Sequence, residues 1–551
     1  MKKISRRQFL RSSAVSGALG AAAAVCGLPV FAEENALVKE PTVESVEEEN
    51  CLNLLKKKVN LPEKVDRSNL PRVIITTDLE VDDINGILLT LMYSDQYDLA
   101  GLVWTAGMYH FNGDGKHTLA EITPNYKCEV GTIGGTVRNA GDLKSFRPAE
   151  PHILNRLVDV NYREDYPKLV ANNPNYPTPD ELLSVVKEGN VEFEGDTRYE
   201  TEGSNWIKQC ILDDDPRLLY ITHWGGINTT ARALLSIYEE YGQTAQWSSI
   251  RDKVVNKVRF LGSGEDNCRA DSKIDELFPG LKESEAKSFF YYGQFFSPIT
   301  ASEETRPYYQ AEYLKDAFKF NHGRVMGEFH LMGDGQVIYG EPYIYQYGLV
   351  TYMDFKELWD AGYSVVEWVK NMPRYEMNRY DWMCCQFTTC FIDIGLRQDV
   401  CNSNDRYTAI MFDELAARAD WAVKEPSECN HAPIVTAETL DFSAAAGDTV
   451  TLRGSAWDPD GDKLNVSWWV PMNACTYKDY TGQVQSSMFG GVEKVESDTP
   501  QLTVEGKRFV GKFTVPADAK VGDRFVVNME VQDVAERPMT RFAQFVVNVV
   551  H

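Results

Sequence analysis

The sequence has too few basic residues to balance its acids. Lysine and arginine together number 56 against 81 aspartate and glutamate residues, which gives a formal net charge of −25. Nucleic acids and anionic membranes attract positively charged surfaces, and their phosphates repel a chain with this charge. We therefore expect neither to be a partner. Small or neutral ligands fit this composition better.

The sequence also lacks the paired cysteines of a zinc site. Its 11 cysteines are scattered, and none stands in the CxxC spacing that such sites use. The densest group is Cys384, Cys385, Cys390 and Cys401. In an oxidising compartment this group is where we expect a disulfide, whereas an anaerobic source would leave these residues as thiols.

The apolar run near the N-terminus is too short to be a typical membrane span. Residues 14–27 are rich in alanine and glycine, follow the twin-arginine motif Ser5–Leu10 and precede a cleavage site at Val30–Ala32. We interpret residues 1–32 as a twin-arginine signal peptide. The protein is then exported and works in the periplasm, at the cell surface or outside the cell. The alternatives are an anchoring helix and a lipid anchor at Cys26, where the preceding valine makes a poor lipobox.

The length of 551 residues exceeds what one hydrophobic core usually serves, so at least two domains are expected. Residues 33–66 are acidic and then basic, with little apolar periodicity, which indicates a spacer. Residues 67–425 combine buried strands with amphipathic helices, which is typical of an α/β domain. Residues 432–551 have the strand and turn spacing of a β-sandwich. Its clearest expected strands are 449–452, 464–469, 508–515 and 524–531.

The stretch Pro71–Tyr93 organises the rest of the chain. The β-branched run Val73–Thr77 predicts a strand, and the apolar spacing from Ile84 to Leu91 predicts a helix. Between them stand four acids, Asp78, Glu80, Asp82 and Asp83. The carboxyl ends of parallel strands form the ligand crevice of an α/β sheet, and clustered carboxylates suit a hard cation such as Ca²⁺. The alternative is that these acids only cap the helix.

These residues resemble the inosine-uridine type nucleoside hydrolases, whose first strand ends in Asp-x-Asp-Pro-Gly-x-Asp-Asp. Asp78 matches the second Asp, Asp82 and Asp83 match the closing pair, and Thr76 stands where the first Asp would be. The chain is most similar to the divergent nucleoside hydrolase-like branch of secreted bacterial proteins, some of them associated with cellulose degradation. The resemblance implies a mostly parallel sheet with helices on both faces and a C-terminal Ig-like sandwich.

The resemblance also implies a calcium site. Its ligands would be the carboxylates of Asp78, Asp83 and Asp334 and the main-chain carbonyl of Asn228. The last of these lies in the turn His223–Thr230, between an expected strand at 217–222 and an expected helix at 231–241. This turn is similar to the family's Gly-Pro-Leu-Thr-Asn turn, and its two glycines allow close approach of a ligand. The alternative is that the helix N-terminus binds an anion.

The catalytic roles follow from the same resemblance. Asp78 would accept a proton from the attacking water, and Asp82 would hold ribose hydroxyls. Gly333 replaces the family's protonating histidine, so His330, or else His322, is the candidate acid for the leaving group.

Further substrate contacts are expected in two loops. Met108 replaces an asparagine that touches the ribose in the family, and Asn112, or else His110, is the substitute. The polar loop after the expected strand 258–262 offers Glu265, Asp266 and Asn267 for sugar hydroxyls. The alternative for this loop is a solvated Asx turn.

We therefore expect an exported, calcium-dependent hydrolase of N-ribosides or a related glycoside. The rival is a non-catalytic carbohydrate-binding accessory protein that keeps the ion for structure. The departures at Thr76, Met108 and Gly333 favour this rival. A third hypothesis, a polysaccharide hydrolase, needs two carboxylates flanking the bond, with Glu265 and Glu328 as candidates.

Two features of the expected sandwich also bear on ligands. The loop Asp458-Pro459-Asp460-Gly461-Asp462 is similar to the acidic loops of calcium-stabilised Ig-like modules, and it either binds calcium or forms a plain tight turn. Trp468 and Trp469 are adjacent in one expected strand, so their side chains point to opposite faces. One then belongs to the core, and the other faces a sugar or the first domain.

Overall fold

The computed structural model describes residues 59–79, 81–107, 110–124, 129–133, 136–146, 148–261, 272–283, 308, 313, 315–329, 337–338, 341–342, 405–478 and 502–550. The expected signal peptide, most of the expected spacer and the group Cys384–Cys401 lie outside these residues. The described cysteines Cys210, Cys429 and Cys475 are buried free thiols. Among the described helices, none is long and apolar enough to cross a membrane.

A six-stranded sheet forms the centre of the α/β region. Its order is β5–β2–β1–β6–β7–β8, and every neighbouring pair is parallel. The strands are β1 Arg72–Thr77, β2 Asp98–Trp104, β5 Val186–Glu188, β6 Leu219–Trp224, β7 Val258–Leu261 and β8 Lys282–Glu283. This is the order of a doubly wound sheet, in which the chain moves outward in one direction from β1 and then in the other.

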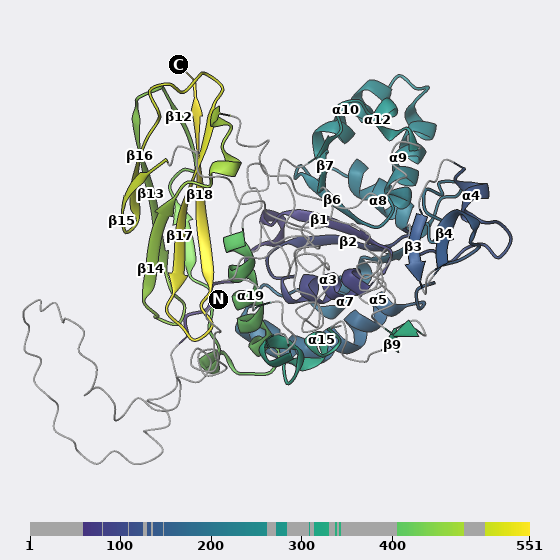
Figure 1. Cartoon of the computed structure of the whole chain (residues 1–551), viewed down its shortest axis with the longest axis horizontal. Helices are drawn as coiled ribbons and strands as arrows, with labels where there is room; N and C mark the ends of the chain where they lie inside the picture. Colours follow the sequence, from purple (N-terminus) through teal and green to yellow (C-terminus); the bar gives the residue numbers. More distant parts are fainter. Residues whose placement is uncertain are drawn as a thin grey trace, which may run out of the picture. The chain divides into compact units, whose positions relative to one another are not determined.

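Helices cover both faces of this sheet, as predicted. Val73 and Ile75 join an apolar cluster with α3 (Val81–Met92) and α19 (Asp405–Trp421). Ile74 joins a second cluster on the opposite face, because side chains alternate along a strand. That face is covered by α8 (Glu202–Leu212), α9 (Asn228–Tyr241) and α10 (Trp247–Lys257), and Figure 1 shows α3 and α8–α10 on different sides of β1 and β2.

Shorter elements fill the connections. They are η1 Arg67–Asn69, α4 Leu119–Ile122, β3 Glu129–Ile133, β4 Thr136–Asn139, η2 Ala140–Asp142, α5 Ile153–Arg156, η3 Leu157–Tyr162, α6 Arg163–Asn172, α7 Pro179–Ser184, α12 Ile274–Leu277, η5 Lys315–Lys319, α15 Gly323–Gly327, β9 Val337–Ile338, β10 Glu341–Pro342, η8 Pro426–Glu428 and η9 Met472–Ala474. Half of them lie between β2 and β6, where the sequence has its long insertion.

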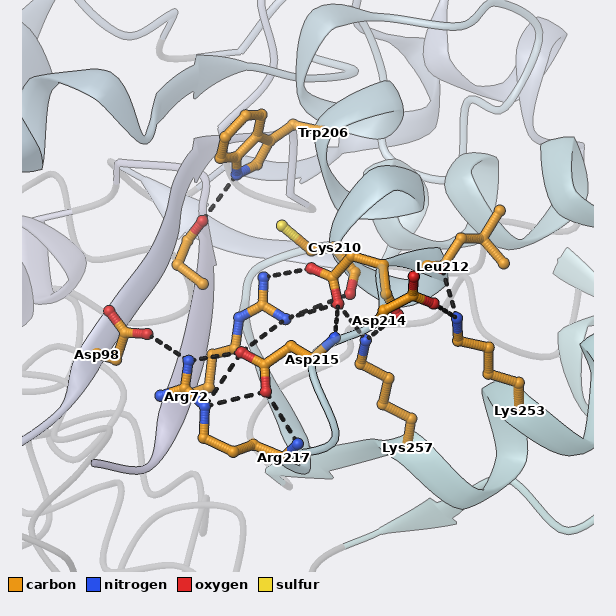
Figure 2. Close-up of polar contacts among 12 residues, drawn as sticks. Arg72, Asp98, Trp206, Cys210, Leu212, Asp214, Asp215, Arg217, Lys253 and Lys257 are labelled. Atoms are coloured by element: carbon orange, nitrogen blue, oxygen red, sulfur yellow. Dashed lines mark hydrogen bonds and ion pairs between the residues drawn. The ribbon is translucent and has the colours of Figure 1, made fainter. Parts of the chain in front are cut away.

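Ion pairs fasten the amino edge of the sheet (Figure 2). Arg72, the first residue of β1, donates to Asp213 with an Nη2–Oδ2 distance of 2.7 Å. Arg217, just before β6, donates to Asp98 of β2 over 2.9 Å and to the carbonyl of Leu70 over 3.0 Å. These charges are satisfied by one another, which leaves the opposite, carboxyl edge as the place for a ligand.

The C-terminal region is an all-β sandwich, as predicted. One sheet has the order β11–β13–β16–β15 and the other β12–β18–β17–β14. Their strands are β11 Ile434–Ala437, β12 Asp441–Ala444, β13 Thr449–Trp457, β14 Leu464–Trp469, β15 Val504–Lys507, β16 Val510–Thr514, β17 Arg524–Asp533 and β18 Thr540–Val549. Only β12 and β18 pair in parallel among the described strands of the two sheets.

The two adjacent tryptophans of β14 do point to opposite faces. Trp468 lies in the sandwich core, where its ring stacks on Phe545 at a centroid distance of 5.6 Å. Trp469 packs against the apolar cluster of α3 and α19, and its Nε1 donates to Glu530 over 2.9 Å. It therefore faces the first domain.

A buried carboxyl on α6 makes stability depend on pH. Burial raises the pKa of Asp165 from 3.8 to about 6, although its oxygens accept the N–H groups of Arg324 and Val325 over 2.9 and 2.7 Å. The folded protein then holds this proton more tightly than the unfolded chain. The stabilisation is therefore complete below about pH 4 and is lost as the pH rises through about 6.

Because of Asp165, the free energy of unfolding is expected to fall as the pH rises through about 6. We expect Asp165→Asn to remove this part of the pH dependence. The measurement is urea unfolding followed by circular dichroism at pH values on both sides of the transition. Asp159→Asn is the matched control, since its carboxyl is mostly exposed and pairs only with Arg163 among the described residues. An unchanged slope in Asp165→Asn would contradict the assignment.

Candidate functional site

The candidate site lies where the strand order reverses. β1 ends at Thr77 and β6 ends at Trp224, and these strands are neighbours although some 140 residues separate them in the sequence. The next residues after them are Asp78 and Gly225, and the N–H of Asp78 donates to the carbonyl of Trp224 over 3.1 Å. In doubly wound sheets this switch point at the carboxyl edge is where ligands bind.

Two glycines shape the surroundings of Asp78. Its side chain is buried, and a Cβ added at Gly107 would lie 1.9 Å from its Oδ2. A Cβ added at Gly225 would lie 2.6 Å from the same oxygen, and Gly225 has a φ of +89°, which other residues rarely adopt. The Asp78 carboxylate can occupy this position only because the residues that follow β2 and β6 here, Gly107 and Gly225, have no side chain.

Asp83 belongs to the first turn of α3 and points back to the end of β1. Its side chain is buried, and its Oδ2 accepts a hydrogen bond from Thr77 Oγ1 over 3.1 Å. The same hydroxyl accepts the N–H of Leu79 over 3.0 Å. Leu79 has a φ of +65°, which is unusual for a bulky residue. This strained turn places Asp78 and Asp83 at the same edge of the sheet. Strained backbone conformations are frequent at functional sites.

Asn228 brings an amide oxygen to this edge. It is fully buried, and its Nδ2 donates to the carbonyl of Asn190 over 2.6 Å. Its Oδ1 is buried and accepts no hydrogen bond from the described residues. A Cβ at Gly226 would lie 2.4 Å from this oxygen, so glycine again leaves access to it. An amide oxygen without a donor is costly in the interior, and it is a ligand type that Ca²⁺ accepts.

Helix α9 begins at Asn228, three residues earlier than the sequence indicated, and β6 continues to Trp224. The main-chain carbonyl of Asn228, which the resemblance indicated as a ligand, therefore belongs to the first helical turn. Carbonyls there point along the helix toward the amide four residues later. The side-chain oxygen is the one that lacks a partner.

Hydrogen bonds tie the loops around the site together. Thr229 Oγ1 lies 2.7 Å from Thr105 Oγ1 and accepts the N–H of Asn190 over 2.8 Å. The carbonyl of Asn190 also accepts the N–H of Ala106 over 2.9 Å, and the carbonyl of Ala106 accepts the N–H of Gly226 over 3.1 Å. These hydrogen bonds connect the ends of β2 and β6 to each other and to the loop after β5.

Glu194 is a site residue that the sequence did not indicate. It is fully buried, and its Cγ would lie 3.2 Å from a Cβ at Gly226, the glycine that also borders Asn228. A buried acid therefore lies beside the turn that follows β6. Glu194 follows the short strand β5 by six residues, and recognising that strand was the signal that could have found it.

A cavity of about 310 Å³ borders the site. It is lined by Leu79, the residue after Asp78, and by Trp104 at the end of β2, and among its polar lining residues are Lys187, Glu188 and Glu202. Small-molecule sites combine an apolar wall with a few polar groups in this way. Trp104 contributes to the apolar wall, although it is only 7% exposed and belongs to the buried cluster of α3 and α19.

The remaining expected residues divide into those the structure describes and those it does not. Asn112 is half-buried, and its N–H donates to Val191 over 2.9 Å, in the segment that leads to Glu194. The side chain of Asp82 and all of Glu265, Asp266, Asn267, His330 and Asp334 lie outside the described residues. The Nδ1 atom of His322 lies 3.2 Å from Asp420 Oδ1, and the Oε1 atom of Glu328 lies 3.2 Å from Arg156 Nη1. Both are engaged in contacts that fit structural roles.

Comparison with known proteins gives matches over both regions. Residues 72–359, more than half of the chain, match the family described as "Cellulose-binding Sde182, nucleoside hydrolase-like domain". Residues 449–549 match the family described as "Cellulose-binding protein Sde0182, C-terminal domain". No curated protein matches the chain.

Two solved structures are also similar. One is a nucleoside hydrolase-related hypothetical protein from Saccharophagus degradans that is associated with carbohydrate metabolism, with 20% identity, a TM-score of 0.53 and coverage of 87% of this chain and 100% of that chain. This likeness shows the fold alone. The other is a chimeric titin Z1Z2, with 16% identity, a TM-score of 0.12 and coverage of 22% of this chain and 98% of that chain. A TM-score that low supports no conclusion.

Proposed function

Because the chain belongs to the Sde182 nucleoside hydrolase-like family, we propose that it is an exported, calcium-dependent hydrolase of N-riboside or related glycosidic bonds. The observation that supports this most strongly is the buried carboxylate of Asp78, enclosed by Gly107 and Gly225 at the switch point of the sheet. Such an enclosed acid suits catalysis or a metal, and a helix cap does not require it.

The donor set fits a calcium ion. Asp78 and Asp83 offer carboxylate oxygens, and Asn228 offers the amide oxygen that lacks a hydrogen bond among the described residues. We propose Asp334 as the remaining carboxylate. All these donors are oxygens, which Ca²⁺ prefers. A bound calcium ion supplies a positive charge that makes a coordinated water more acidic.

The chain's own residues would then perform the following steps. Asp78 takes a proton from the attacking water, and His330 gives a proton to the leaving group. Asp82 and Asn112 bind sugar hydroxyls. Glu265, Asp266 and Asn267 bind them from the loop after β7. The Trp104 cavity accommodates the part of the substrate that does not react.

The test is release of reducing sugar by the mature protein in the presence of Ca²⁺, from a panel of purine and pyrimidine nucleosides and of cello-oligosaccharides. We expect Asp78→Asn to lower the rate by about 10²–10⁴-fold, as is typical for loss of a general base. Asp214→Asn is the matched control, because its side chain is fully exposed at the far edge of the sheet. Full activity in Asp78→Asn would overturn the proposed mechanism.

A second candidate is a carbohydrate-binding accessory protein without turnover. Two observations favour it, namely the cellulose-binding description of both matched families and the polar side chains that line the cavity. Retention on microcrystalline cellulose without product from any substrate would support it. Loss of retention in Glu188→Ala, at an exposed position that lines the cavity, with unchanged thermal stability, would place the carbohydrate in the cavity.

A further inference from the structure

Three carboxylates gather in the loop between β13 and β14, far from Asp78 in the sequence. Asp458, Asp460 and Asp462 each bring one oxygen to within 4.8 Å of the others. Gly461, with a φ of +77°, allows the turn that brings them together. Three negative charges this close repel one another, and the repulsion grows where water is excluded.

Asp458 distinguishes this loop from a plain turn, in which all buried polar atoms would form hydrogen bonds within the loop. Its side chain is only 9% exposed. Its Oδ1 accepts the N–H groups of Asp460 and Asp462, both over 2.9 Å. Its Oδ2 is buried and accepts no hydrogen bond from the described residues. An ionised carboxylate oxygen that is buried without a donor is strongly unfavourable, and a bound cation relieves this cost.

No lysine or arginine in the described parts of the chain pairs with Asp458. The basic side chain that contacts the cluster is the imidazole of His431, whose Nδ1 lies 3.1 Å from Asp460 Oδ1. The main-chain N–H of His431 also donates to Asp460 Oδ2 over 2.7 Å. These contacts engage Asp460 and leave the oxygen of Asp458 without compensation.

We propose that Asp458, Asp460 and Asp462 bind a calcium ion at a site separate from the one at Asp78. The ligands are all oxygens supplied by alternate residues of one short loop, an arrangement in which Ca²⁺ accepts irregular geometry and Mg²⁺ does not. The ion neutralises the cluster and occupies the unsatisfied oxygen of Asp458.

The site has a structural consequence because Asp460 also holds His431. The other nitrogen of that imidazole, Nε2, lies 3.1 Å from Asn172 Oδ1 on α6, and its ring stacks on Trp421 of α19 at 5.3 Å. An ion that fixes Asp460 therefore fixes the segment between α19 and the sandwich. Calcium is expected to raise the melting temperature of the whole chain through this loop.

The test is a calcium titration by calorimetry on the full chain carrying Asp78→Asn and Asp83→Asn, so that the first site does not contribute. Extracellular calcium modules bind with dissociation constants of roughly 10⁻⁴–10⁻³ M, which sets the range of the titration. We expect one equivalent of Ca²⁺ to bind with little competition from Mg²⁺. Adding Asp458→Asn should abolish this binding and the calcium-dependent rise in melting temperature.

Glu505→Gln is the matched control, since its side chain is exposed on β15 of the same sandwich. It should bind calcium like its parent. Asp462→Asn, at a half-buried position, replaces Asp458→Asn if the latter fails to fold. Absence of calcium binding in the parent, or retention of binding in the folded loop variant, would overturn the proposal. Activity at the Asp78 site does not enter either outcome.

Discussion

Replacing Gly107 with alanine should weaken calcium binding at the Asp78 site by roughly 10–100-fold, the usual loss when the support of a metal ligand is disturbed. The new Cβ would lie 1.9 Å from Asp78 Oδ2 and 2.8 Å from its carboxyl carbon. The backbone of Gly225, only 3.1 Å from the same Cβ, restricts the space on the other side. The carboxylate therefore has to leave its place.

The measurement is calcium calorimetry in an Asp458→Asn background, which isolates the Asp78 site, with circular dichroism to verify folding. Gly327→Ala is the matched control, because no atom of the described residues outside its own helical turn lies within 4 Å of its added Cβ, and its φ is not positive. Gly225→Ala should act in the same direction as Gly107→Ala. Parental affinity in Gly107→Ala would show that the Asp78 carboxylate is not a ligand.

Replacing Arg418 with methionine should lower the free energy of unfolding by about 3–5 kcal/mol, the cost of leaving a buried charge without its partner. Arg418 is fully buried on α19 and pairs with Asp95 over 2.7 Å and with Glu414 over 2.9 Å. Its guanidinium also lies 4.3 Å from the ring of Tyr93. Glu414 keeps a second partner, Arg541, at 2.8 Å, so Asp95 is the carboxylate that loses most.

Urea unfolding followed by tryptophan fluorescence measures this effect. Adding Asp95→Asn to Arg418→Met should recover part of the loss, because the unpaired charge is then removed. Arg251→Met is the matched control and should change stability by less than about 1 kcal/mol, since its ion pair with Asp252 is exposed. An equally small change in Arg418→Met would show that the pair contributes nothing net.

The sequence was most informative where a structure depends on neighbours in the chain. The passage from β-branched residues through four acids to an amphipathic segment predicted the β1–α3 unit and the position of Asp78 and Asp83 at its junction. Alternation predicted strands β13, β14, β16 and β17 of the sandwich and the opposite faces of Trp468 and Trp469. These patterns are readable because a strand repeats every two residues and a helix every 3.6.

The sequence by itself thus determined that the chain has an α/β region with acids at a strand end and an all-β region after it. Only the tertiary structure decided that β6 lies beside β1, that Gly107 and Gly225 enclose Asp78, and that Glu194 lies near Asn228. It also decided that Asp460 holds His431. The physical reason is that these contacts join residues distant in sequence, and their geometry follows from strand order and packing, which no local pattern encodes.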